Sequence, residues 1–145
     1  MKRLMSIIAV LSVLLINSSV YAITPEEVSE YMISHIERKA ETTRYDYWQT
    51  PEETIKLGTG DCEDFTFLAY SLLKKSYKCY IVRINAEPKL DHMILVIDYP
   101  KGRKSYFNNG YLHKPYTNKI EQIIRNIYRV DKSYRIIEKF KYGRQ

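Results

Sequence analysis

The chain has 145 residues, the length of a single domain, and its 23 lysines and arginines against 17 aspartates and glutamates give a formal net charge of +6. The basic residues are scattered, without a dense stripe or a nucleic-acid-binding motif, so the composition argues against a nucleic-acid partner. This mild positive charge is typical of a solvated surface.

Residues 1–22 have the three parts of a secretory signal. Basic residues precede an apolar run from Ile7 to Ile16, and small residues before Ala22 offer a cleavage site. The apolar run is too short to span a bilayer comfortably. We therefore predict a signal peptide over residues 1–22 and one mature domain over residues 23–145. The mature protein is expected in the periplasm or the medium, without a membrane span.

Two helices are predicted from the same Thr-Pro-Glu-Glu start signal. Thr24 and Thr50 are the N-caps, a proline takes the first helical position, and a glutamate closes each capping box. The spacing of apolar residues predicts that the first helix runs to about Ala40 and that the second, shorter helix ends at Leu57. The loop between them carries the only tryptophan, Trp48.

The next stretch, Gly58-Thr59-Gly60-Asp61-Cys62-Glu63-Asp64, reads as a glycine turn that opens into a helix with a cysteine in its first turn. Asp61 is a good N-cap and Asp64 closes the capping box. The free N–H groups and positive dipole end of a helix stabilise an anion, so we expect a lowered pKa for Cys62 and a nucleophilic thiol. A disulfide with Cys79, or an inert buried thiol, is the alternative.

Beyond Ser76 the pattern changes to β-branched and aromatic residues with breakers between them. Three strands are predicted at residues 77–86, 92–99 and 104–108. The hairpin loop at residues 100–103 makes the second and third of these antiparallel neighbours. A turn at Lys114-Pro115, a helix containing Ile120 to Ile127 and a last strand at residues 134–140 complete the chain. Helices followed by an antiparallel sheet indicate the α+β class.

A cysteine nucleophile needs a base, and the base needs a group that orients it. Of the three histidines, His35 is expected in the core or at its rim, whereas His92 stands at the start of a strand, where it can face a helix start. His92 is therefore the candidate base.

The orienting group is sought among the neighbours of His92. Asp98 is on the same strand and lies roughly 20 Å away at 3.3 Å per residue, and Asp91 points to the opposite face. Asn108 and Asn109 lie across the hairpin, and an asparagine can orient an imidazole. Only one of the two can serve, because one step along a strand turns the side chain to the other face.

Four short blocks between residues 46 and 112 form one set of motifs. They are Trp48-Gln49-Thr50-Pro51-Glu52-Glu53, Gly58-Thr59-Gly60-Asp61-Cys62-Glu63-Asp64, His92-Met93-Ile94-Leu95-Val96 and Tyr106-Phe107-Asn108-Asn109. The set resembles the bacterial transglutaminase-like cysteine proteinases, a family that includes periplasmic proteases that release adhesins from cell surfaces.

This resemblance implies a papain-like, transglutaminase-like fold in which N-terminal helices pack on an antiparallel sheet. It implies an exported thiol protease that cleaves a cell-surface or periplasmic protein through an acyl-enzyme and needs no cofactor for the chemistry. We expect the protein to be a monomer. Cys62 would be the nucleophile, His92 the base and Asn108 the orienting group, at a position where the family usually has aspartate. The alternatives are a transglutaminase or glutamine deamidase with the same triad, and an inactive binding module of the same fold.

Two further expectations concern the surroundings of Cys62. Trp48 or Gln49 would add a side-chain donor to the oxyanion site, whose first donor is the backbone N–H of Cys62. The resemblance also implies calcium binding by Asp61 and Glu63, although two carboxylates are too few for an ion that takes six to eight oxygen ligands. The alternative is that both are ordinary acidic residues at a capped helix start.

Overall fold

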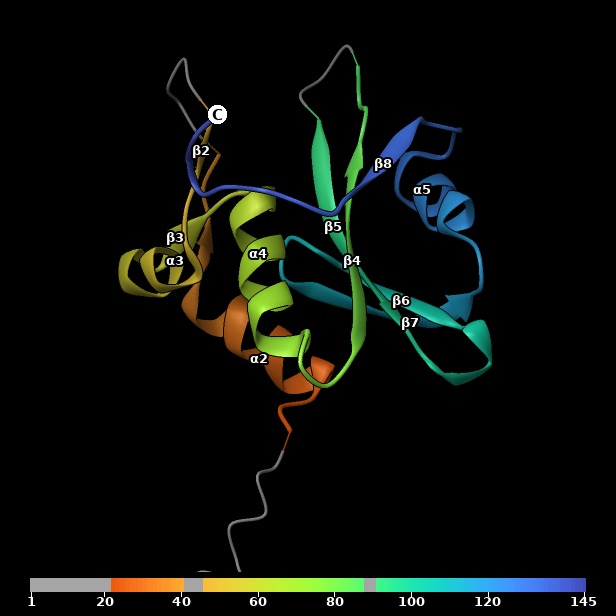
Figure 1. The fold of residues 1–145 in the computed structure, drawn as a ribbon, viewed down its shortest axis with the longest axis horizontal. Coiled ribbons are helices and arrows are strands. Elements are labelled where there is room, and N and C mark those ends of the chain that lie inside the picture. The colour runs from red at the N-terminus through yellow and green to blue at the C-terminus, as the bar shows by residue number, and fades with distance from the viewer. Residues whose placement is uncertain (1–21, 41–45, 88–90) are drawn as a thin grey trace, which may run out of the picture.

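The computed structural model of the protein describes residues 22–40, 46–87 and 91–145 (Figure 1). The predicted signal peptide over residues 1–22 therefore lies outside the described residues except for its last position. Within the described ranges, no helix is long and apolar enough to cross a membrane.

A five-stranded antiparallel sheet forms the centre of the fold, with the strand order β7-β6-β5-β4-β8. In chain order its strands are β4 (Lys78–Ile84), β5 (His92–Asp98), β6 (Lys104–Asn108), β7 (Tyr111–Thr117) and β8 (Tyr134–Ile137). The predicted hairpin between β5 and β6 is confirmed, with the short 3-10 turn Pro100–Gly102 in its loop. β5 is the middle strand, and all its residues from Met93 to Ile97 are buried, as expected for a strand covered on both faces.

Helices cover both faces of this sheet. The helices α2 (Pro25–His35), α3 (Pro51–Leu57) and α4 (Cys62–Leu73) lie on one side, and α5 (Ile120–Tyr128) lies on the other (Figure 1). Because side chains alternate along a strand, Met93, Leu95 and Ile97 join the core under α4, whereas Ile94 and Val96 join the core under α5. The predicted α+β arrangement of N-terminal helices on an antiparallel sheet is confirmed.

The helix starts lie where the capping signals predict them. The Thr24 and Thr50 hydroxyls accept from the backbone N–H groups of Glu27 and Glu53, whose carboxylates accept from the cap N–H groups in return. α3 ends at Gly58, which adopts the left-handed conformation with a φ of 64° that glycine tolerates best.

The prediction that the first helix runs to Ala40 is wrong, because α2 ends at His35. Ile36 is extended, and the next two residues form β1 (Glu37–Arg38), which pairs in parallel with β3 (Thr59–Gly60). This pairing competes successfully with further helix because it satisfies backbone groups on both sides of the glycine turn. As a result, Arg38 lies beside the segment that leads into α4.

The turn predicted at Lys114-Pro115 is also wrong, because these residues lie inside β7. β7 is an edge strand, and its register against β6 shifts between Lys104 and Tyr106. Proline has no N–H for a ladder, so it is tolerated on an edge strand and near such an irregularity.

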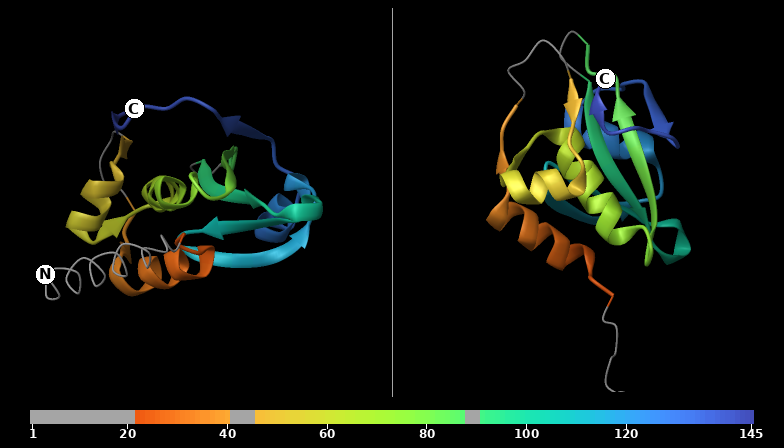
Figure 2. Two further views of the ribbon diagram at one scale, coloured as in Figure 1. Left: turned by 60° about the horizontal axis from the view of Figure 1, so that its bottom comes forward. Right: turned by 60° about the vertical axis from the view of Figure 1, so that its left-hand side comes forward.

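The last strand is shorter than predicted, because β8 stops at Ile137. Residues 138–142, here called the crossing segment, then run over α4 to the other side of the molecule, as Figure 2 shows. Phe140 stacks on Phe67 of α4 with ring centroids 4.6 Å apart. The chain ends in β9 (Gly143–Arg144), which pairs with β2 (Tyr47–Trp48).

Candidate active site

Cys62 is the first residue of α4, and the helix start around it is tightly bonded. The Asp61 side chain accepts from the N–H of Glu63 at 3.1 Å, and the buried Asp64 carboxylate accepts from the N–H of Asp61 at 3.1 Å. The same carboxylate accepts from the N–H of Gln49 at 2.8 Å. The predicted capping box is therefore present, and it also fastens the segment before α3 to the cysteine helix.

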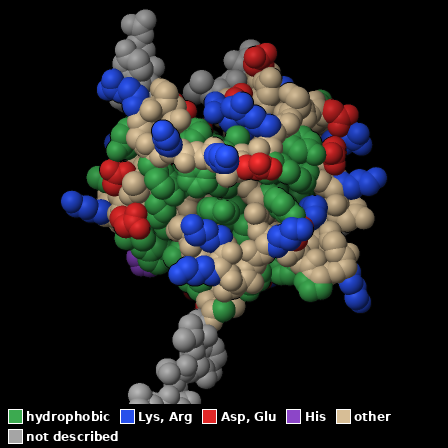
Figure 3. Space-filling view, viewed as in Figure 1, with side chains coloured by type: hydrophobic (Ala, Val, Ile, Leu, Met, Phe, Trp, Pro, Cys, Tyr) green, Lys and Arg blue, Asp and Glu red, His purple; other side chains and the backbone are tan. Residues whose placement is uncertain are grey.

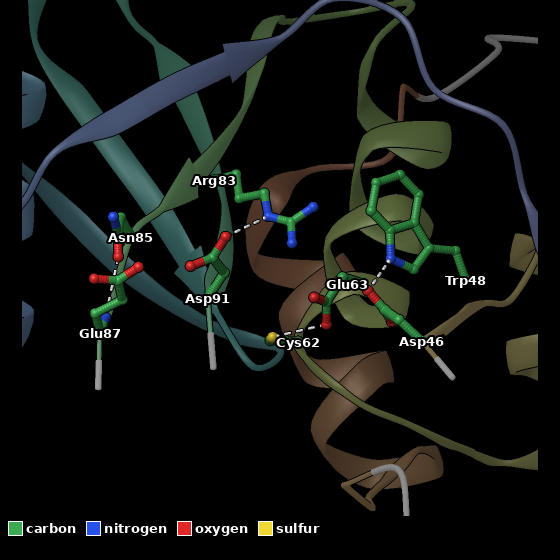
Figure 4. A network of polar contacts seen from close by, with 8 residues as sticks. All are labelled: Asp46, Trp48, Cys62, Glu63, Arg83, Asn85, Glu87 and Asp91. Carbon is green, nitrogen blue, oxygen red and sulfur yellow. Dashed lines mark hydrogen bonds and ion pairs between the residues drawn. The ribbon is translucent and has the colours of Figure 1, made fainter. Parts of the chain in front are cut away.

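The Cys62 thiol lies between its helix and the start of β5. It donates a hydrogen bond to Oε2 of Glu63 at 2.9 Å (Figure 4). Burial and then the Glu63 carboxylate raise the pKa of Cys62 well above its ordinary value, and the backbone N–H of Met93 acts in the opposite direction. The expectation of a lowered pKa is wrong for this arrangement, because desolvation and a neighbouring carboxylate outweigh the helix start.

The structure identifies Glu63 as the side chain that contacts the Cys62 thiol and influences its pKa. It is 7% exposed, and burial followed by the charge of Asp61 raises its pKa. A carboxylate beside a thiol disfavours the thiolate by charge repulsion. In this arrangement Cys62 is held as a neutral thiol.

Replacing Glu63 with glutamine is therefore expected to speed the alkylation of Cys62. Burial raises the pKa of Glu63 to about 8, so its negative charge is present above that pH. Removing it lowers the pKa of the thiol, and a drop of about one unit raises the labelling rate above pH 8 on the order of tenfold. The measurement is iodoacetamide labelling across pH in a Cys79→Ser background. Glu52→Gln, on the exposed first turn of α3, is the matched control, and an unchanged rate in Glu63→Gln would contradict the role given to this carboxylate.

His92 and Asn108 are brought together by the pairing of β5 with β6. Leu95 lies opposite Phe107, so Asn108 lies diagonally across from His92 on the same face of the sheet. The Nε2 atom of His92 is 2.8 Å from Oδ1 of Asn108. Because a carbonyl oxygen only accepts, Nε2 carries the proton, and Nδ1 is the nitrogen left to act as a base.

The surroundings of His92 keep it neutral. Burial is the largest effect on the His92 pKa and lowers it; the bond to Asn108 raises it, and the positive charge of Arg38 lowers it. The Tyr128 ring of α5 stands edge-on to the imidazole with centroids 6.5 Å apart. A neutral imidazole is the form that can accept a proton from a thiol.

Asn109, the rival of Asn108, occupies a different place. It has a φ of 48°, in the turn that leads through Gly110 into β7, and its Oδ1 is buried without a hydrogen-bond partner among the described residues. A Cβ on Gly110 would lie 3.0 Å from the Phe65 ring, so this turn packs closely against α4.

The two aspartates near His92 in sequence have other partners. Asp91 accepts from Nε of Arg83 at 2.8 Å. Asp98, at the far end of β5, accepts from the Tyr80 hydroxyl at 3.0 Å and pairs with Lys104. Neither contacts the imidazole, as the facing and reach of the strand predict.

The other histidines and cysteine lie away from Cys62. His35 is exposed and stacks on Tyr31 with centroids 4.7 Å apart, so its expected place in the core or rim is wrong. His113 stacks on Tyr106. Both cysteines are free, which excludes the disulfide alternative, and burial followed by Asp98 raises the pKa of Cys79 to about 11.

Trp48 and Gln49, the two candidates for a side-chain oxyanion donor, differ in their hydrogen bonds within the protein. The Trp48 indole N–H donates to Oδ2 of Asp46 at 3.0 Å and is therefore occupied (Figure 4). The Gln49 side chain has a buried Oε1 without a partner in the described part of the chain. An oxyanion would accept from the Nε2–H group of Gln49, whereas Oε1 can only accept a hydrogen bond.

The two candidate calcium ligands are both engaged within the protein. Asp61 caps α4, and Glu63 accepts from the Cys62 thiol. Within the described ranges, no group of three or more histidine, cysteine, aspartate or glutamate side chains could hold a metal ion. Since calcium takes six to eight oxygen ligands, the residues present do not by themselves fit a calcium site.

Sequence reasoning missed three contributors to this site, namely Arg38, Tyr128 and the N–H of Met93. The sequence pattern predicts a helix at Arg38, and Tyr128 lies on α5, far from His92 in sequence and on the other face of the sheet from α4. No local pattern marks these residues, because only the pairing of β1 with β3 and the packing of α5 bring them here.

Comparison with known proteins shows the family to which the chain belongs. Residues 8–100 match the model of the transglutaminase-like domain, and no curated protein matches the chain. Solved structures of Legionella pneumophila LapG are similar, with 23% identity and a TM-score of 0.49 over 61% of this chain and 54% of that one. Calcium-bound LapG shows 23% identity and a TM-score of 0.49 over 76% and 60%, and EGTA-treated LapG shows 25% and 0.48 over 62% and 54%. The chain thus spans about half the length of the first of these proteins.

Proposed function

Because the chain belongs to the family of transglutaminase-like domains, we propose that it is a cysteine peptidase with Cys62 as nucleophile, His92 as base and Asn108 as orienting residue. One observation carries the proposal: His92 Nε2 is 2.8 Å from the Asn108 amide oxygen, while the N–H of the residue after His92 faces the Cys62 thiol. This is the order of groups that thiol acyl transfer requires.

The reaction begins when the thiol turns from Glu63 toward His92. Nδ1 of His92 takes the thiol proton, and the sulfur attacks the carbonyl carbon of a peptide bond. The imidazolium gives its proton to the leaving amine, which leaves a thioester on Cys62. His92 then takes a proton from water as the water oxygen attacks the thioester carbonyl. The C–S bond breaks, the acid is released, and the imidazolium returns its proton to the Cys62 sulfur.

Asn108 and Gln49 assist without taking part in bond making. Asn108 holds the tautomer of His92 that has a free Nδ1, and as a neutral amide it orients the ring without adding charge. The backbone N–H of Cys62 and the side chain of Gln49 would donate to the oxyanion that forms on the attacked carbonyl.

The substrate that suits this proposal is a periplasmic or cell-surface protein, since the chain carries the features of an export signal. The test is digestion of a fluorescently labelled general protein substrate, with mass spectrometry of the products. New amino termini that Cys62→Ala does not produce would support a peptidase. If the products instead show glutamine deamidation or amine incorporation without chain cleavage, the peptidase proposal is replaced by the deamidase or transglutaminase alternative.

Calcium binding is tested separately, by thermal unfolding with added calcium or chelator. A site that includes Asp61 and Glu63 predicts a Tm that rises with calcium, because an ion that binds only the folded state stabilises it. Asp61→Asn is the informative variant, since asparagine caps a helix as well as aspartate and removes only the charge. A calcium-dependent Tm that Asp61→Asn loses would establish the ligand. A Tm that is unchanged by calcium would leave Asp61 as a cap and Glu63 as the thiol's partner.

A further inference from the structure

Two arginines lie side by side on the sheet next to the candidate active site. Arg83 of β4 is directly opposite Arg135 of β8 in the strand register, so both side chains are on the face that α4 covers. Like charges in directly opposite positions repel each other. Only Arg83 has a carboxylate partner among the described residues, namely Asp91, and Arg135 has none.

Arg83 is held in a fixed orientation. Its Nε donates to Asp91 at 2.8 Å, and its guanidinium lies over the Trp48 ring at 6.0 Å from the centroid. Figure 4 shows it between these two partners, on the side of Trp48 that leads to Cys62. Its terminal nitrogens have no hydrogen-bond partner within the described ranges, and the side chain is 24% exposed, so a ligand can reach them.

Arg83 and Arg135 are here called the basic strip. Arg135 also lines a groove beside the crossing segment. The groove has a volume of about 550 Å³, and its apolar lining comes from Trp48, Ile136, Ile137 and Phe140. Its charged lining consists of Arg135, Lys139 and Lys141 against Glu138. Figure 3 shows lysine and arginine side chains grouped around apolar ones on this face of the molecule.

The two partners of Arg83, Asp91 and Trp48, are sequence neighbours of His92 and Gln49 in the candidate active site. Asp91, which holds Arg83, is the residue before His92, and Trp48, on which Arg83 stacks, is the residue before Gln49. Burial is the largest cause of the raised pKa of the Tyr128 hydroxyl, followed by Cys62 and then Asp91, so both groups lie close enough to act on this side chain. A polypeptide placed on Cys62 therefore has Arg83 within reach of a neighbouring side chain.

We propose that Arg83 and Arg135, with the Trp48 ring and the groove beside the crossing segment, form a subsite for an acidic side chain of a polypeptide substrate. This inference rests on the proposed peptidase function, and it adds the substrate class. A carboxylate between the two guanidinium groups accepts charge-assisted hydrogen bonds from both and removes their mutual repulsion. Asp91 and Trp48 fix Arg83 in advance, so little side-chain freedom is lost when the ligand binds.

Binding to an inactive protein tests the subsite without relying on catalysis. The whole chain with Cys62→Ala is titrated with two fluorescent peptides, Ala-Ala-Glu-Glu-Ala-Ala and Ala-Ala-Gln-Gln-Ala-Ala, by anisotropy at low salt. We expect the Glu peptide to bind about tenfold more tightly, with a preference that shrinks as salt is added. Arg135→Gln and Arg83→Gln should abolish this preference.

Arg129→Gln, which removes an exposed arginine at the C-cap of α5 that does not line the groove, is the matched control and should keep the preference. Arg135 is exposed, so its replacement keeps the test interpretable if Arg83→Gln fails to fold. Equal binding of the two peptides, tighter binding of a Lys-Lys peptide, or a preference that survives Arg135→Gln would each overturn the proposal. Absence of cleavage by the wild-type protein would count against the peptidase function alone, because the binding titration does not depend on it.

Discussion

Replacing Cys62 with alanine is expected to lower the rate of substrate hydrolysis by roughly 10³-fold or more, because the covalent step is lost and only binding and oxyanion contacts remain. The fold should survive, since the thiol makes one side-chain hydrogen bond, to Glu63, while Asp61 and Asp64 supply the helix cap. The measurement is initial-rate hydrolysis of the labelled protein substrate, with folding checked by circular dichroism.

Cys79→Ser is the matched control for this experiment. Cys79 is a free, half-buried thiol on β4, with a partly apolar environment and no part in the site around His92. Its replacement should leave turnover nearly unchanged. Equal losses in Cys62→Ala and Cys79→Ser, with both proteins folded, would show that the nucleophile has been misassigned.

The second large effect is expected at Asn108. Asn108→Ala removes the group that holds Nε2 of His92, and turnover should fall by about 10- to 100-fold, as expected for a residue that acts through another. Asn108→Asp should keep or raise turnover, because a carboxylate accepts the same hydrogen bond and also stabilises the imidazolium. The rescue by aspartate separates orientation of His92 from a merely structural role.

The pH dependence gives an independent readout of the same pair. In the wild-type protein, burial lowers the pKa of His92 below the ordinary histidine value of 6.5. The imidazole is therefore still neutral at pH 6.5, and the acid limb of the rate profile lies below that pH. A negative charge at residue 108 raises the pKa of the imidazole. The acid limb in Asn108→Asp should therefore move to higher pH, and Asn108→Ala should not move it in that direction.

Two replacements serve as controls for Asn108. Asn118→Ala removes an exposed asparagine outside the site and should have no effect. Asp98→Ala removes the other side chain that could be imagined as a partner of His92, and it should leave the chemistry intact because Asp98 pairs with Lys104 at the far end of β5. Loss of activity in a folded Asp98→Ala, together with normal activity in Asn108→Ala, would require a different site.

The relation of sequence to site is clearest at the start of α4. Asp61 and Asp64 are three residues apart, and the capping hydrogen bonds that place Cys62 run between these two residues. The same holds for Thr24 and Thr50. Contacts of this range depend on local backbone geometry, which the residue types specify directly. The helix starts were therefore predictable to the residue.

The sign of the pKa shift at Cys62 could not be predicted in this way. The helix start favours the thiolate, and that contribution is local. The larger contributions come from burial against β5 and from the side chain of Glu63, whose own burial depends on the packing of the whole domain. Desolvation is a property of the complete tertiary structure, so the sequence pattern led to the wrong direction.

The sequence by itself determined the α+β class, the starts of three helices, the hairpin that carries His92 and Asn108, and the position of Cys62 on its helix. Only the tertiary structure decided the other features. They are the end of α2 at β1, the distinction between Asn108 and Asn109, the neutral state of the Cys62 thiol and the crossing segment that brings β9 to β2. The physical reason is range: caps and turns are satisfied within a few residues, whereas strand register, burial and charge proximity depend on segments that meet only when the chain has folded.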